Sequence, residues 1–267
     1  MYQISNAYFN SRQLDCKQKK MKNLVILGAG TAGTMMANHL VSKLPKKEWQ
    51  ITIVDQYKTH YYQPGFLFLP FDIYTEDQVK KVGKKFIPNG VNYIQKKIEQ
   101  IFPKDNKVQL EDETLKYDIL IVATGCKIAP QETEGMKGEN WHKTVFDFYT
   151  FEGSLALRNK LRDWKGGKMV VHFTEMPIKC PVAPLEFVFL ADSYFTKKGM
   201  RNKVDLTYVT PLGGAFTKPK ATAALSHLMK EKNIKVVTDF NIESVDNEKN
   251  QIVDYGNTTV DFDLLVT

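Results

Sequence analysis

The chain has 267 residues, of which 43% are hydrophobic and 25% are charged, the proportions of a globular protein with a sizeable core. No run of 18 or more apolar residues occurs, so the sequence predicts no transmembrane span. The formal net charge of +7 is a mild excess that favours a solvated basic face, and without a recognised motif we expect no nucleic-acid partner. Three cysteines far apart in the sequence give neither a disulfide framework nor metal-ligand spacing, so we expect no metal site and a reducing compartment.

A dinucleotide-binding pattern lies near the start of the chain. Residues 23–27 form a short apolar run of β type that leads directly into Gly28-Ala29-Gly30-Thr31-Ala32-Gly33, and helical spacing follows. A second strand over residues 50–54 closes on Asp55, which lies 22 residues after Gly33. Such glycines let the backbone approach a pyrophosphate at a helix N-terminus, and the acid accepts a hydrogen bond from a ribose hydroxyl. An aspartate there favours FAD or NAD over NADP.

An aromatic loop comes next, within residues 58–72, and reads His60-Tyr61-Tyr62-Gln63-Pro64-Gly65-Phe66-Leu67-Phe68-Leu69-Pro70. Aromatic side chains this dense beside proline and glycine indicate either a loop that covers the core or a wall against a flat ring, and both readings stay open. Beyond it, residues 92–101 alternate as one strand, and the turn at 103–106 before residues 107–110 predicts a β-hairpin.

A further buried strand, residues 117–122, ends in Ala123-Thr124-Gly125. Small residues at the carboxyl end of a parallel strand let a cofactor come close to the backbone. An ordinary exit from strand to turn is the alternative, and the glycine pattern upstream favours the cofactor.

The second half repeats the strand-helix-strand plan without glycines in the corresponding turn. Its predicted helices cover residues 151–164, 184–195 and 222–231, and its predicted strands cover residues 169–173, 205–210, 234–237, 241–245, 251–255 and 263–267. After the first of these strands, two prolines flank a cysteine in Pro177-Ile178-Lys179-Cys180-Pro181. A thiolate is favoured near cations or a helix N-terminus, and Lys179 and the predicted helix near Pro184 would supply both. The turn therefore indicates redox chemistry in place of a nucleotide site.

These elements predict an α/β fold of two Rossmann-like units, each three-layered with a parallel sheet and a β-hairpin or meander crossover. Residues 1–20 are polar without a signal-peptide core, and we expect a disordered extension or an upstream-start artefact. Residues 21–150 would form the cofactor-binding domain, and residues 151–267 a second, incomplete Rossmann-like domain without the glycine pattern.

The order of these motifs resembles the sulfide:quinone oxidoreductase family of two-domain flavoproteins, from about Met21 to the last residue. The specific segments are His60-Tyr61-Tyr62-Gln63-Pro64 and Pro177-Ile178-Lys179-Cys180-Pro181-Val182-Ala183-Pro184, whereas the glycine pattern and Ala123-Thr124-Gly125 are shared by the wider superfamily.

The resemblance implies specific roles for nine residues and a reaction. FAD would be the cofactor, and Cys180 would be one of two redox cysteines that accept sulfide sulfur and pass electrons to it. The residues implied in cofactor binding are Gly28, Gly30, Gly33, Asp55, Gln63, Pro64, Thr124 and Gly125. The substrates would be sulfide and a quinone at a membrane surface. The resemblance implies a cytoplasmic or peripheral membrane location, which in a eukaryote would be the mitochondrial inner membrane. Assembly into a homo-oligomer is left open.

The sequence also departs from that family. The second redox cysteine, a later Gly-Asp motif and C-terminal amphipathic helices of the family have no counterpart up to Thr267, and Cys126 is expected to be a buried, inert thiol rather than the missing partner. His172 lies inside a predicted strand and is interpreted as a packed core residue. Two alternative functions remain: another flavoprotein such as a type II NADH dehydrogenase, and a truncated flavin-binding protein without catalysis.

Overall fold

The computed structural model describes residues 20–267, which form two compact units. Within the described residues, the first unit contains residues 20–58 and 83–124, and the second contains residues 59–82 and 125–267. The extension predicted over residues 1–20 lies outside the described residues except for Lys20. The boundary predicted between residues 150 and 151 falls inside the second unit, directly before a helix.

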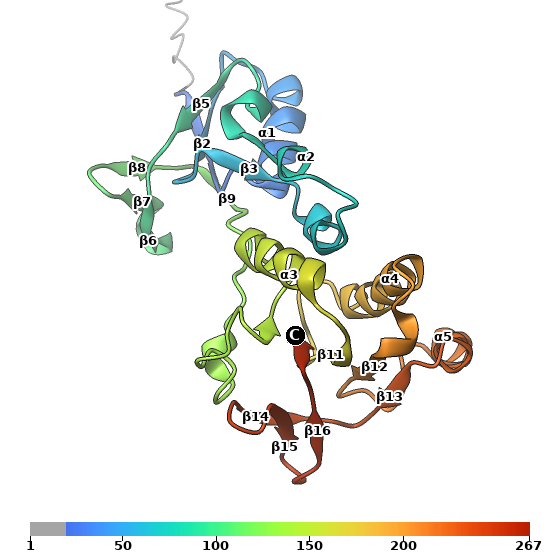
Figure 1. Ribbon diagram of the computed structural model, residues 1–267. Helices are drawn as coiled ribbons and strands as arrows, with labels where there is room; N and C mark the ends of the chain where they lie inside the picture. The colour runs from blue at the N-terminus through green and yellow to red at the C-terminus, as the bar shows by residue number, and fades with distance from the viewer. Residues whose placement is uncertain (1–19) are drawn as a thin grey trace, which may run out of the picture. The chain divides into compact units, whose positions relative to one another are not determined.

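The first unit is built on a parallel sheet whose strand order is β5-β2-β1-β9 (Figure 1). Its strands are short apolar runs, and helix α1 connects the two central strands, β1 and β2, which pair in parallel as a β-α-β unit. The elements are β1 (Lys22–Leu27), α1 (Thr31–Lys43), β2 (Trp49–Val54), β5 (Val91–Ile94) and β9 (Ile119–Val122).

An antiparallel sheet in the same unit contains β6 (Ile98–Phe102), β7 (Lys107–Leu110) and β8 (Thr114–Lys116). The hairpin between β6 and β7 turns through the predicted segment, with Asn106 in the left-handed conformation at φ 52°. The prediction of one strand over residues 92–101 is wrong. The chain leaves the parallel sheet after β5 and enters the hairpin sheet at β6, so residues 95–97 belong to no strand.

The second unit has a five-stranded parallel sheet in the order β10-β17-β11-β12-β13 and a small antiparallel sheet in the order β14-β15-β16 (Figure 1). The helices are α3 (Phe151–Asp163), α4 (Ala183–Lys197) and α5 (Pro219–Glu231). The strands are β10 (Val145–Phe146), β11 (Gly167–His172), β12 (Val204–Val209), β13 (Lys235–Val237), β14 (Ile242–Asp246), β15 (Gln251–Asp254), β16 (Thr259–Asp261) and β17 (Leu264–Val266). The predicted α/β fold with two Rossmann-like units is confirmed.

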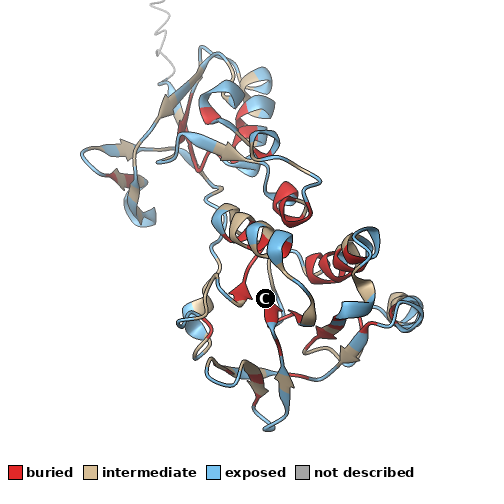
Figure 2. Cartoon of the chain, in the orientation of Figure 1, coloured by how far each residue is buried: buried red, intermediate tan, exposed pale blue. Residues whose placement is uncertain are grey.

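The largest hydrophobic core among the described residues lies in this second unit, where side chains of β11, β12 and β17 pack against α3 and α4. Figure 2 shows buried positions in red along these helices. Fully buried aromatic rings fill much of this core, and Phe187 of α4 stacks on Phe148 with ring centroids 4.8 Å apart. The buried carboxylate of Asp192 on α4 accepts hydrogen bonds from Arg201 at 2.7 Å and from Lys232 at 2.8 Å, which hold the helix in place. This packing fixes the start of α4, where the cysteine turn ends.

The aromatic segment of residues 59–82 also packs into the second unit. It contains β3 (Thr59–Tyr61), two 3₁₀ turns (Gln63–Leu67 and Leu69–Phe71), α2 (Glu76–Val79) and β4 (Lys80–Val82). Phe66 and Leu69 are buried, and the ring of Phe71 lies 4.9 Å from that of Phe187. The part of the loop after Pro64 therefore covers the core, while Gln63 and Pro64 themselves are exposed.

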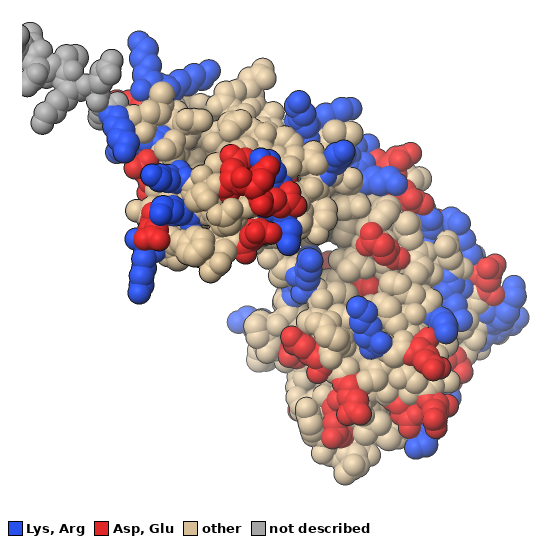
Figure 3. Space-filling model, turned by 90° about the vertical axis from the view of Figure 1, so that its left-hand side faces the viewer, with Lys and Arg blue, Asp and Glu red and all other residues tan. Residues whose placement is uncertain are grey.

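Charged side chains of both signs are interspersed on the face of the molecule drawn in Figure 3. Among the helices of residues 20–267, none combines the length and the apolar character needed to cross a bilayer.

Candidate functional site

The glycine turn between β1 and α1 is closely packed on two sides and open on the third. Gly28 has a φ of 94°, and a Cβ there would overlap the carbonyl of Ala123 at the end of β9. A Cβ on Gly33 would overlap the carbonyl oxygen of Gly28, so the helix packs directly on the turn. A Cβ on Gly30, by contrast, would meet no atom within 4 Å. The turn thus requires glycine at two positions for its own packing and leaves open space beside the third.

The N-terminus of α1 begins at this open side. Gly30 is the N-cap, no side chain caps the helix, and its first turn has no acidic residue. The unsatisfied N–H groups of a helix N-terminus carry partial positive charge, so this end can accept an anionic group such as a phosphate.

Asp55, at the end of β2, holds the turn in place. Its Oδ2 accepts a hydrogen bond from the Ala29 N–H at 2.6 Å, and its Oδ1 accepts one from the Tyr57 N–H at 2.8 Å. Each carboxylate oxygen has a second lone pair, so the side chain can still accept a hydrogen bond from a hydroxyl group of a ligand.

The structure divides the nine predicted site residues between the two units. The first unit brings Gly28, Gly30, Gly33 and Asp55 together at the carboxyl ends of β1 and β2, with Thr124 against Gly28. The others belong to the second unit: Gln63, Pro64, Gly125 and Cys180.

The second unit has its own turn at the corresponding place, residues 173–182 between β11 and α4. Cys180 is an exposed, free thiol with a φ of 62°, in the left-handed region. Its carbonyl oxygen accepts two hydrogen bonds, from the Ala183 N–H at 3.1 Å and from the Tyr149 hydroxyl at 3.4 Å. Cys126, expected to be buried, is exposed, while Cys16 lies outside the described residues.

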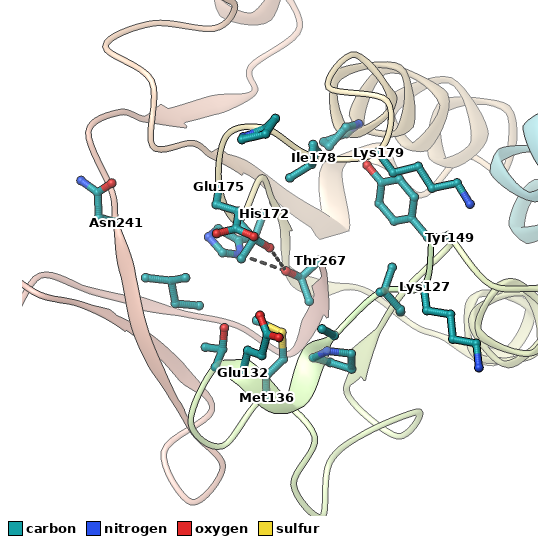
Figure 4. Close-up of a pocket in the computed structure, with 18 of the residues that line it drawn as sticks. Lys127, Glu132, Met136, Tyr149, His172, Glu175, Ile178, Lys179, Asn241 and Thr267 are labelled. Carbon is teal, nitrogen blue, oxygen red and sulfur yellow. Dashed lines mark hydrogen bonds between the residues drawn. The ribbon is translucent and has the colours of Figure 1, made fainter. Parts of the chain in front are cut away.

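A cavity of about 710 Å³ opens at the carboxyl ends of β11 and β17, lined in part by Lys127, Tyr149, Glu175 and Lys179 (Figure 4). In open parallel sheets this is the edge at which ligands bind. Cys126 also lines this cavity. Lys179, another lining residue, directly precedes Cys180 in the sequence. The described residues contain no group of three or more His, Cys, Asp or Glu side chains that could hold a metal ion.

His172, the last residue of β11, is a packed core residue. It is 2% exposed, its Nδ1 lies 2.9 Å from the hydroxyl of Thr267, and its ring meets Phe240 edge-on. Its Nε2 has no hydrogen-bond partner among the described residues. Burial lowers the pKa of the imidazole to about 3, so it is neutral at physiological pH and unsuited to act as a general base.

No pattern in the sequence points to Tyr149, whose hydroxyl contacts the cysteine turn. The sequence does contain a recognisable signal for the neighbouring anchor: Asp147 and Thr150 directly precede an apolar-periodic helix. Asp147 is 1% exposed and accepts hydrogen bonds from the Thr150 N–H and hydroxyl, while the Thr150 side chain caps α3 by accepting from the Gly153 N–H at 2.9 Å.

Together, the two parallel sheets and the glycine turn define a two-unit α/β protein with the Rossmann-like fold of dinucleotide-binding oxidoreductases. The sequence matches the pyridine nucleotide-disulphide oxidoreductase family over residues 22–171, more than half of the chain, and the chain belongs to this family.

Within that family, the resemblance to sulfide:quinone oxidoreductases is confirmed. The chain is 26% identical to the mitochondrial sulfide:quinone oxidoreductase of Dictyostelium discoideum, over 98% of this chain and 59% of the relative, and 24% identical to that of Mus musculus, over 89% and 53%. The solved structure of the Aquifex aeolicus sulfide:quinone oxidoreductase shares the fold, with a TM-score of 0.78 and 21% identity over 92% of this chain and 58% of that one. The chain therefore spans little more than half the length of these relatives.

A type II NADH:quinone oxidoreductase of Staphylococcus aureus matches a smaller part. It is 28% identical over 123 residues, which cover 43% of this chain and 29% of the relative.

Proposed function

We propose that this chain is the FAD-binding and sulfide-oxidising part of a sulfide:quinone oxidoreductase. In this proposal, the Cys180 thiol and sulfide form an S–S bond, which leaves a persulfide on Cys180, and FAD would take up the two electrons and two protons released. The electrons would then pass from FAD to a quinone. The observation that carries the proposal is the contrast between the two turns: an intact glycine turn in the first unit and an exposed free thiol at the corresponding turn of the second.

The residues of the first unit fit a dinucleotide cofactor. The open side of Gly30 would admit the pyrophosphate next to the uncapped N-terminus of α1, and Asp55 would accept a hydroxyl of the adenosine ribose. Thr124, which lies against Gly28, would complete the contacts of this unit to FAD. For Gly125, Gln63 and Pro64, a role in binding FAD is implied by the family resemblance alone. Bound flavin supplies the two-electron redox chemistry that protein side chains lack.

The cysteine turn would supply the sulfur chemistry. A thiolate is the reactive form of cysteine, and an exposed position gives sulfide access to Sγ of Cys180. Lys179 and the N-terminal end of α4, three residues away, place positive charge beside this turn.

The same turn argues against NADH as the electron donor. Residues 173–182 contain no glycine, so the backbone between β11 and α4 cannot approach a pyrophosphate as the first turn does. Sulfide and a quinone are therefore the proposed substrates. A quinone dissolved in a membrane implies contact with the membrane surface, of the mitochondrial inner membrane in a eukaryote.

The test is anaerobic addition of sulfide to flavin-loaded protein while the flavin absorbance is recorded. We expect bleaching in the unmodified chain and a loss of at least tenfold in its rate in Cys180→Ser. Cys126→Ser is the matched control, because it removes the other exposed thiol of the same unit. Equal bleaching rates in Cys180→Ser and the unmodified chain would overturn the role of Cys180, and bleaching by NADH would favour the NADH dehydrogenase alternative.

A further inference from the structure

Cys180 is held by a tyrosine that lies far from it in the sequence. The Tyr149 hydroxyl donates a hydrogen bond to the carbonyl oxygen of Cys180 at 3.4 Å, across 31 residues of chain. The same carbonyl accepts the N–H of Ala183, the first residue of α4. One peptide group is thus fixed from two sides while the cysteine occupies the left-handed region at φ 62°, which residues other than glycine rarely adopt.

The tyrosine is itself fixed in position. Its ring stacks on Phe148 with centroids 4.6 Å apart, and Phe148 stacks on Phe187 of α4 at 4.8 Å. The backbone on its other side is held by the buried carboxylate of Asp147, which accepts the Thr150 N–H at 2.7 Å. Both the ring and the backbone of Tyr149 are therefore attached to the second unit's core, and the hydroxyl is presented to the cysteine turn from a rigid support.

We propose that Tyr149 is a positioning residue for Cys180: its hydroxyl holds the turn so that the thiol stays exposed beside the N-terminal end of α4. The role as part of a reaction rests on the proposed function of Cys180. Burial, followed by the nearby Cys180, raises the pKa of Tyr149 well above its ordinary value, so the phenol remains a protonated donor throughout the pH range in which a thiol ionises.

The test compares the alkylation of two thiols in one molecule. The full chain is treated with iodoacetamide over a pH series, and the rates at Cys180 and Cys126 are measured separately by mass spectrometry of their peptides. Both thiols are exposed, so Cys126 serves as the internal reference. The variant is Tyr149→Phe, which keeps the ring stack and removes only the donor. Tyr255→Phe is the matched control, because it removes a hydroxyl from another tyrosine that lines the same cavity.

In Tyr149→Phe we expect alkylation of Cys180 to slow two- to tenfold relative to Cys126, about the effect of losing one neutral hydrogen bond. The rate at Cys126 should stay unchanged in this variant at every pH of the series. Tyr255→Phe should leave both rates as they are. A ratio of Cys180 to Cys126 labelling that is unchanged or increased in Tyr149→Phe would overturn the inference, and so would an equal slowing of both thiols, because that would indicate general loosening of the unit.

This measurement needs neither sulfide nor flavin. If sulfide fails to bleach the flavin-loaded protein but Tyr149→Phe still slows Cys180 selectively, the proposed function fails and the positioning role stands. If bleaching depends on Cys180 and the labelling ratio does not change, the reverse holds.

Discussion

The turn after β1 and the turn after β11 occupy the same place in two similar units, but they are built in different ways. The first uses residues 28–30, after which α1 starts at once and packs on the turn through Gly33. The second uses residues 173–182, so that ten residues separate the end of β11 from the start of α4. A short glycine turn keeps the backbone N–H groups available to a phosphate, whereas the longer turn exposes a side chain.

The difference extends into the strands. β1 ends on Leu27, an apolar residue at 0% exposure, and β11 ends on His172 at 2% exposure. The second unit thus has a buried titratable group where the first has none, and the cavity beside it is lined by side chains rather than by a glycine backbone. In a fold that repeats, the turn determines which chemistry each unit can host.

The largest expected effect comes from His172 and concerns the stability of the second unit. Because burial lowers its pKa from 6.5 to about 3, the folded state binds the proton less well than the unfolded state. Its contribution to the free energy of unfolding is complete above pH 6.5 and is lost as the pH falls from 6.5 toward 3. At pH 4 the loss amounts to about 3 kcal/mol. In His172→Phe, this part of the pH dependence should disappear.

Urea unfolding followed by tryptophan fluorescence measures this in a Trp49→Phe background, where Trp141 and Trp164 of the second unit remain. His227→Gln is the control, since His227 lies exposed on α5. If the free energy of unfolding changes equally between pH 7 and pH 4 in the unmodified protein and in His172→Phe, the buried histidine does not distinguish the second unit in this way.

The next effect concerns the close packing of the glycine turn. In Gly33→Ala, the new methyl group overlaps the Gly28 carbonyl, so the turn and α1 must separate. We expect a loss of about 2 kcal/mol in the stability of the first unit, the usual cost of overpacking. Hydrogen exchange in peptides from β1 and β2 measures it. Unchanged protection would mean that glycine is not required for packing at this position.

The smallest effect separates packing from ligand binding. In Gly30→Ala, the methyl group enters open space and the backbone φ of −70° suits alanine, so stability should change by less than about 1 kcal/mol. FAD affinity should nevertheless fall about tenfold, because the methyl group occupies the space beside the helix N-terminus that a pyrophosphate needs. Titration of the apoprotein with FAD, followed by flavin fluorescence, measures it. If Gly30→Ala binds FAD with full affinity, the pyrophosphate does not occupy the space beside Gly30.

Local patterns predicted most of the elements because each depends on neighbouring residues. The apolar runs of β1 and β11 and the helical spacing of α1 and α4 agree with the structure to within a few residues. The break at residues 95–97 was missed because the alternation continues through it, and only pairing with two different sheets interrupts the strand. The aromatic loop left two readings open, and its packing on α4 decided between them for the part after Pro64.

The sequence by itself determined the α/β class, the glycine turn with its acid at Asp55 and the cysteine at the second turn, because spacing along a strand-turn-helix segment fixes these features. Tertiary structure alone decided the membership of residues 59–82 in the second unit, the exposure of Cys126 and the hydrogen bond from Tyr149 to Cys180. The physical reason is that burial and contacts between residues 31 or more positions apart depend on how strands order themselves in a sheet, which no local pattern records.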